Sequence, residues 1–138
     1  LEPLAPHCLL LAGYMRVVTA TLIDAFHGRW QDNLPGVINI HPADTRAYQG
    51  AHGYEYALGL LKKSPRRLTE TSITVHFVDK GVDTGPIIAQ RPVPIRTNDS
   101  LEDLKSRGLT IEHELYPDCL ELYARKKITI SDGNVTIL

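Results

Sequence analysis

The chain has 138 residues, of which 43% are hydrophobic, enough to bury one compact domain over residues 1–138 and too few for two. Fifteen basic residues against sixteen acidic ones give a formal charge of −1, which disfavours nucleic acid as a partner because such binding usually needs a basic surface. Two widely separated cysteines and the lack of a long apolar run favour a cytoplasmic protein without disulfides, a metal site or a membrane span.

The first half of the chain has the order strand, helix, strand, helix. A short apolar run predicts a buried strand over residues 7–12, and apolar residues at helical spacing predict a helix over about 19–28. A second buried strand is expected over 37–40. Helical spacing ending in two lysines, which suit the C-terminal dipole, predicts a second helix over 52–63.

The second half of the chain predicts two strands, a long helix and a hairpin. The strands are expected over 71–79 and 86–95, the second with prolines that suggest a sheet edge. A helix capped at residues 98–100 should run to about Ala124, and a hairpin should follow over 127–138. This order predicts an α/β fold whose opening strands are parallel, with ligands at their carboxyl ends.

Four polar residues follow or interrupt predicted strands where loops converge: Asn39, His41, His76 and Asp83. An oxyanion-stabilising amide, an imidazole and a carboxylate that holds the imidazole charged suffice for acyl transfer to an amine. Each residue also has a structural interpretation, with Asn39 and Asp83 as turn formers and His76 as a hydrogen-bonded core side chain. The sequence has no Gly-x-Ser-x-Gly elbow, zinc-ligand spacing or glycine-rich nucleotide loop, which disfavours other reaction classes.

Four sequence blocks resemble the folate-dependent formyltransferases: LLLAGYMRVVT (9–19), INIHP (38–42), TVHFVDKGVDTGPIIAQRPVPI (74–95) and EHELYP (112–117). The resemblance implies a mixed, partly parallel sheet with flanking helices. It also implies transfer of a formyl group from 10-formyltetrahydrofolate to a primary amine, without a metal. Within the family, the likeness is greatest to members that formylate glycinamide ribonucleotide in the one-carbon steps of purine biosynthesis.

The resemblance also implies a role for each site residue. The Asn39 amide and protonated His41 would donate to the oxyanion, while Asp83 would raise the pKa of His41 and relay the amine's proton through water. His76 would support the catalytic loop. The implied folate site contains Leu11, Met15, Arg16, Val18, Asp79, Lys80, Gly81 and Val82, and the implied substrate site contains Pro42 and Glu112.

The sequence departs from the family pattern in several places. Residues 43–46 replace the usual Ser-Leu-Leu-Pro, Leu109 replaces a ribose-contacting glutamine, and residues 83–85 are closer to the tRNA and sugar formyltransferases. The nucleotide-binding half typical of the family does not precede these blocks. We therefore expect a fold truncated at its N-terminal side, with that half supplied by another segment or with pairing into a homodimer. A non-catalytic folate-binding or assembly module, and a formyltransferase acting on a sugar-nucleotide amine or aminoacyl-tRNA, stay open as alternatives.

Overall fold

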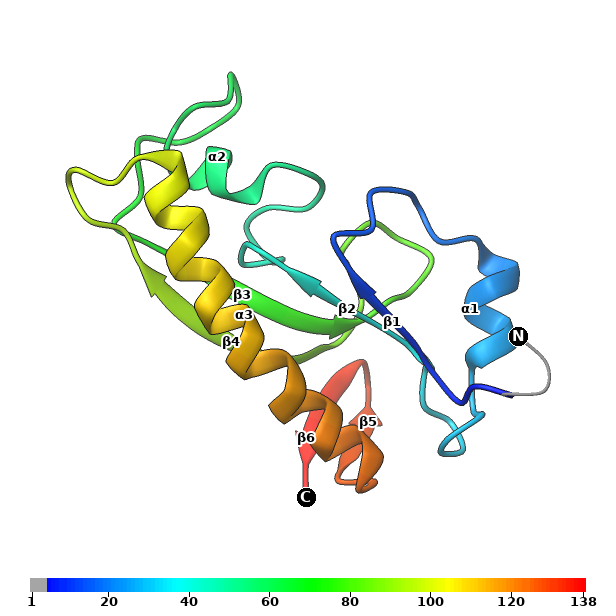
Figure 1. The fold of residues 1–138 in the computed structure, drawn as a ribbon. Coiled ribbons are helices and arrows are strands. Elements are labelled where there is room, and N and C mark those ends of the chain that lie inside the picture. Colours follow the sequence, from blue (N-terminus) through cyan, green and yellow to red (C-terminus); the bar gives the residue numbers. More distant parts are fainter. Residues whose placement is uncertain (1–4) are drawn as a thin grey trace.

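The computed structural model describes residues 5–138, so the first four residues of the predicted domain lie outside it. The described part contains a four-stranded sheet with the order β1-β2-β3-β4 and a separate hairpin (Figure 1). The strands are β1 (Leu9–Ala12), β2 (Val37–His41), β3 (Glu70–Phe77) and β4 (Ile87–Pro94), and the hairpin is β5 (Ile128–Ser131) and β6 (Asn134–Ile137). β1 and β2 are parallel and the other pairings are antiparallel, which confirms the mixed, partly parallel sheet.

Three helices flank the sheet within residues 5–138: α1 (Ala20–Phe26), α2 (Gly53–Ala57) and α3 (Leu101–Ala124). α3 crosses one face of the sheet and packs on β3 and β4 (Figure 1). It begins where predicted, because Ser100 and Asp103 form a capping box. The Ser100 hydroxyl accepts from the Asp103 amide at 3.1 Å, and the Asp103 carboxylate accepts from the Ser100 amide at 2.9 Å.

The predicted helix over residues 52–63 is wrong in its length. α2 ends at Ala57, and Gly59 follows with φ +76°, a left-handed conformation that commonly terminates helices. Leu60, which seemed to continue the apolar face, is 62% exposed. The helical spacing beyond Ala57 therefore does not mark a buried surface, and the two lysines follow a turn.

The hydrophobic core lies between the sheet and α3, and it also includes the C-terminal hairpin. Its largest fully buried side chains include Ile38 of β2, Ile73 and Phe77 of β3, Leu104 of α3 and Ile128 of β5. Complete burial of one such side chain contributes about 1.5–3 kcal/mol relative to exposure. This packing holds β2 and β3 rigidly, and these strands carry three of the predicted site residues.

Gly108 allows α3 to approach α2 closely. A β-carbon at this position would overlap the Tyr54 hydroxyl oxygen and lie 2.6 Å and 2.7 Å from ring atoms Cζ and Cε1. Tyr54 is only 7% exposed, so its ring has little room to move. Alanine improves helix propensity by about 1 kcal/mol, but overpacking costs about 1–3 kcal/mol, and the overlap here involves three atoms of the Tyr54 side chain.

We therefore expect Gly108→Ala to lower the melting temperature, measured by thermal denaturation with circular dichroism. Thr110→Ala, an exposed position on the same helix, is the matched control and should change the melting temperature little. A Gly108→Ala protein as stable as wild type would show that Tyr54 does not require the missing β-carbon.

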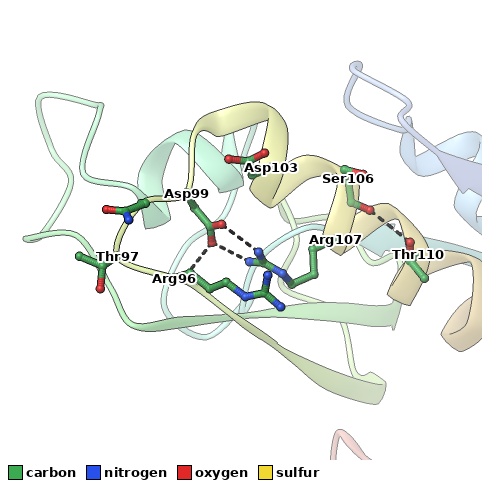
Figure 2. A pocket seen from close by; sticks show the side chains of 8 residues that line it. Arg96, Thr97, Asp99, Asp103, Ser106, Arg107 and Thr110 are labelled. Carbon is green, nitrogen blue, oxygen red and sulfur yellow. Dashed lines mark hydrogen bonds and ion pairs between the residues drawn. The ribbon is translucent and has the colours of Figure 1, made fainter.

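A buried carboxylate organises the start of α3 (Figure 2). Asp99 accepts hydrogen bonds from Arg107 Nη1 at 2.6 Å, from Arg107 Nη2 at 2.8 Å and from the Arg96 amide at 2.7 Å. Hydrogen bonding from Arg107 holds the pKa of Asp99 well below its usual range. These residues line a cavity of about 700 Å³. Because Asp99 and Arg107 satisfy each other, we assign this cluster to stability.

The low pKa of Asp99 makes stability depend on pH. A carboxylate with a depressed folded-state pKa stabilises the fold above its unfolded-state pKa, and this contribution is lost as pH falls. We expect Asp99→Asn to melt below wild type at pH 7, and the difference to narrow as pH falls through 3.8, the ordinary pKa. Glu121→Gln, which removes an exposed ion pair with Arg125, is the control. Equal melting temperatures at pH 7 would contradict this role for Asp99.

Candidate active site

The sheet register brings the predicted catalytic residues to one edge of the fold. Asn39 and His41 are alternate residues of β2, so their side chains point to the same face. Asn39 pairs with His76 of β3, and Asp83 lies in the loop between β3 and β4. All four residues line one cavity of about 270 Å³.

Asp83 lies at the centre of this group and contacts both histidines. Its Oδ2 lies 3.5 Å from His41 Nδ1, and its Oδ1 lies 3.5 Å from His76 Nε2. The Gly50 amide donates to Oδ2 at 2.7 Å. Asn39 Nδ2 lies 3.4 Å from His76 Nε2, which completes a contiguous polar chain.

Backbone carbonyls determine which ring nitrogens carry hydrogens. His41 Nε2 donates to the Tyr48 carbonyl at 3.2 Å, and His76 Nδ1 donates to the Phe77 carbonyl at 2.9 Å. A neutral imidazole has one N–H, so in a neutral ring the nitrogen that faces Asp83 is bare, whereas in an imidazolium the same nitrogen donates to the carboxylate. A proton added to either ring would therefore lie against the Asp83 carboxylate.

Burial and charge act in opposite directions on His41, which is 5% exposed. Burial lowers the pKa of His41 and outweighs the nearby Asp83 carboxylate and the Tyr48 carbonyl, which both raise it. The Asp83 carboxylate thus raises the pKa of His41, as expected, but burial makes the net shift a lowering. Burial also opposes ionisation of Asp83, but hydrogen bonds from His76 and the Gly50 amide and the charge of His41 lower its pKa overall.

The loop that carries Asp83 is held tightly against β3. Asp83 has φ +52°, a left-handed conformation that aspartate tolerates better than most residues. A β-carbon at Gly85 would overlap the Phe77 carbonyl oxygen, so this close approach requires glycine. The glycine-bounded loop seen in the sequence therefore brings Asp83 within reach of His76.

The cavity wall includes most of the predicted ligand-binding residues. From the folate set, the structure places Leu11, Met15, Arg16, Val18, Gly81 and Val82 there, and from the substrate set Pro42 and Glu112. Asp79 and Lys80 are not among the lining residues. The Asp79 carboxylate instead accepts from the Gly81 amide at 2.9 Å and the Thr84 hydroxyl at 2.7 Å, which shapes the loop.

Sequence reasoning missed the contribution of the loop that follows β2. The Tyr48 carbonyl and the Gly50 amide contact His41 and Asp83, and His52 lines the cavity with φ +68°. The Tyr48 contact uses backbone alone, so no residue-type pattern could have revealed it. Gly50, with φ +96°, was the one available signal, because a glycine in a loop often marks special backbone geometry.

Within residues 5–138, no group of three or more His, Cys, Asp or Glu side chains is arranged to hold a metal ion. None of the helices in that part of the chain combines the length and apolar character needed to cross a membrane.

The chain is similar to enzymes of formyl transfer in both sequence and structure. Phosphoribosylglycinamide formyltransferase of Bacillus subtilis (strain 168) is 38% identical over 115 residues, which are 82% of this chain and 51% of that protein. Glycinamide ribonucleotide transformylase 1 from Symbiobacterium toebii has a TM-score of 0.82 at 37% identity, covering 96% of this chain and 56% of that one. The chain thus spans about half the length of these relatives.

A formyltetrahydrofolate deformylase from Pseudomonas syringae pv. tomato str. DC3000 shares the fold, with a TM-score of 0.81 at 24% identity, over 96% of this chain and 40% of that one. The profile of the family described as formyl transferase matches residues 1–120. This match covers most of the sequence, including the catalytic candidates and most of the long helix. The chain therefore belongs to the formyl transferase family.

Proposed function

We propose that this chain forms the folate-binding and catalytic part of an enzyme that transfers a formyl group from 10-formyltetrahydrofolate to the amine of glycinamide ribonucleotide. The convergence of Asn39, His41 and Asp83 in one cavity carries the proposal. The acceptor is supported by relatives named for formyl transfer to this ribonucleotide. The same relatives support a role in purine biosynthesis, and the proposal places the protein in the cytoplasm.

The cavity has the character of a site for a flat, partly apolar ring. When bound, 10-formyltetrahydrofolate supplies the formyl group. Leu11, Met15 and Val18 would provide apolar contacts, and Gly81 permits close approach of the loop backbone. A volume of about 270 Å³ lies near the lower limit of about 300 Å³ for small-molecule sites, which suits the ring portion of the molecule.

Asn39 and His41 would stabilise negative charge as it develops on the reacting oxygen. An amide nitrogen has two hydrogens, so Asn39 can direct one at His76 and the other into the cavity. Because burial lowers the pKa of His41, its charged form is disfavoured in the resting site. Negative charge on the oxygen favours the imidazolium, so the positive charge of His41 would act most strongly in the transition state.

Asp83 would stabilise the charged form of His41 and relay, through water, the proton that the attacking amine loses to the folate nitrogen that leaves. His76 would act as a positioning residue, because it contacts both the Asp83 carboxylate and the Asn39 amide. The Glu112 carboxylate would hydrogen-bond the acceptor's sugar. Burial raises the pKa of Glu112, and the Tyr54 hydroxyl donates to it at 3.3 Å.

The proposal extends to partners of the chain. The acceptor is a small molecule, and the formal charge of −1 disfavours aminoacyl-tRNA. β1 lies at one edge of the sheet, where a second copy or another segment of the protein could pair. A sugar-nucleotide amine is the second candidate acceptor, because Asp83, Thr84 and Gly85 resemble the corresponding residues of sugar formyltransferases.

The proposal is tested by incubating the protein with 10-formyltetrahydrofolate and each candidate amine while following the folate absorbance. We expect transfer to glycinamide ribonucleotide and its loss in His41→Ala. Calorimetry with the folate alone separates the alternatives, since binding without transfer would indicate a non-catalytic folate-binding module. Transfer to no amine, together with no folate binding, would refute both.

A further inference from the structure

The loop over residues 42–52 touches two of the proposed catalytic residues through its backbone. The Tyr48 carbonyl accepts from His41 Nε2 at 3.2 Å, and the Gly50 amide donates to Asp83 Oδ2 at 2.7 Å. Neither contact uses the loop's side chains. Whatever holds the loop backbone in place therefore also determines the surroundings of His41 and Asp83.

One carboxylate at the start of this loop gathers several donors. Asp44 accepts from Arg46 in a two-pronged arrangement, Nε to Oδ1 at 3.0 Å and Nη2 to Oδ2 at 2.9 Å, and also from the Arg46 amide at 3.0 Å. Gln90 Nε2 donates to Asp44 Oδ1 at 3.0 Å, and Arg46 Nη2 donates to Gln90 Oε1 at 3.1 Å. Hydrogen bonding from Arg46 lowers the pKa of Asp44 to about 2, so the carboxylate is ionised at neutral pH.

The cluster formed by Asp44, Arg46 and Gln90 is also hydrogen-bonded to the buried part of the sheet. Gln90 lies on β4, and its Nε2 also lies 2.9 Å from the hydroxyl of Thr74 on β3. Thr74 is fully buried, and its hydroxyl donates to the Ala43 carbonyl at 2.6 Å. The first residues of the loop are thus fastened to both central and edge strands.

A single turn connects Asp44 to Tyr48, whose carbonyl contacts His41. The amides of Ala47 and Tyr48 both donate to the Asp44 carbonyl at 2.9 Å. The Tyr48 ring stacks on Tyr56 of α2, with centroids 4.2 Å apart and planes inclined by 18°. The position of Asp44 is therefore transmitted through the turn to the carbonyl that accepts from His41.

We propose that Asp44, Arg46 and Gln90 are positioning residues for formyl transfer, which hold the loop over residues 42–52 so that its backbone meets His41 and Asp83. This inference rests on the proposed function. The Arg46 side chain is 70% exposed, and exposed ion pairs contribute only about 0–1 kcal/mol to stability. The cluster thus acts through the geometry of the loop more than through the stability of the fold.

Asp44→Leu tests the proposal, because it removes the acceptor of all these donors. We expect kcat to fall about ten- to a hundredfold, with little change in KM for 10-formyltetrahydrofolate, as small displacements near reacting groups cost rates of this order. Asp44→Asn keeps one acceptor oxygen and should lose less. Glu121→Leu breaks an exposed ion pair between Glu121 of α3 and Arg125, and it is the matched control, with kcat unchanged.

A second readout does not depend on turnover. The imidazole signal of His41, assigned by its loss in His41→Gln, is titrated by nuclear magnetic resonance. The groups facing this ring are Asp83, His76 and the Tyr48 carbonyl, and burial is the largest cause of its lowered pKa. Releasing the loop admits water, so the pKa of His41 should rise in Asp44→Leu and stay unchanged in the control.

The outcomes separate this inference from the proposed function. If the His41 titration shifts in Asp44→Leu but the wild-type protein transfers formyl to no amine, the positioning role is supported and the proposed function is refuted. A folded Asp44→Leu protein with unchanged kcat and an unchanged His41 titration would overturn the positioning role. If circular dichroism shows that Asp44→Leu does not fold, Arg46→Leu, at an exposed position, replaces it under the same two criteria.

Discussion

Formyl transfer by His41→Gln should be about a hundred- to a thousandfold slower than by wild type, the usual cost of losing one donor to a developing oxyanion. Glutamine can still place an amide near the Tyr48 carbonyl, but it cannot carry a positive charge beside Asp83. In the native site, His41 Nδ1 lies 3.5 Å from Asp83 Oδ2, so a protonated ring is held by a carboxylate at the moment charge develops. The loss should appear in kcat, measured by the folate absorbance change at saturating substrate.

The control for this variant is His27→Gln, which changes an exposed histidine of the chain and should leave kcat intact. Folding is checked by circular dichroism, because His41 is buried and its loss could loosen β2. A folded His41→Gln protein that keeps wild-type kcat would remove His41 from the catalytic group and leave Asn39 as the proposed donor.

Asp83→Asn should reduce kcat by about a hundred- to ten-thousandfold, the range that a positioned acid or base typically contributes. The substitution changes charge with little change in shape, and asparagine also tolerates the left-handed conformation found at φ +52°. Two histidines would then face a neutral amide, so the imidazolium of His41 would lose its nearest counter-charge. Because Asp83 raises the pKa of His41, its removal should lower that pKa further, opposite to the shift expected for Asp44→Leu.

The chain offers a matched control for this second substitution. Asp132 also has φ +52° and lies in the exposed turn of the β5–β6 hairpin, so Asp132→Asn repeats the same chemical change on the same backbone conformation. Its kcat and its His41 titration should both equal those of wild type. An Asp83→Asn enzyme that retains wild-type kcat would show that the carboxylate is needed for neither the charge of His41 nor the proton of the amine.

Most of the fold could be predicted because its signals are local. The alternation and β-branched residues of β3, the capping residues before α3 and the turn between β5 and β6 all act over a few neighbouring positions. The prediction of a helix over residues 52–63 was wrong because it, too, used only local signals. The apolar residues of this segment have helical spacing, but the chain turns at Gly59 and Leu60 is exposed. Where the helix ends depends on what the segment packs against, and this packing is not a local signal.

The sequence by itself determined the chemical groups of the candidate site. Asn39, His41, His76 and Asp83 could be selected because strand ends in an α/β order converge on one edge, and because their side chains form a set suited to acyl transfer. The family resemblance named the same residues, and the profile match over residues 1–120 confirms that family.

Only the tertiary structure decided the hydrogen-bond partners and the pKa shifts of these groups. The Tyr48 carbonyl and the Gly50 amide reach His41 and Asp83 through the backbone, which residue identity does not encode. The net direction of the His41 pKa shift also depends on packing, because burial opposes the Asp83 charge and proves larger. Desolvation is a property of everything that surrounds a side chain, so it appears only when the whole chain has folded.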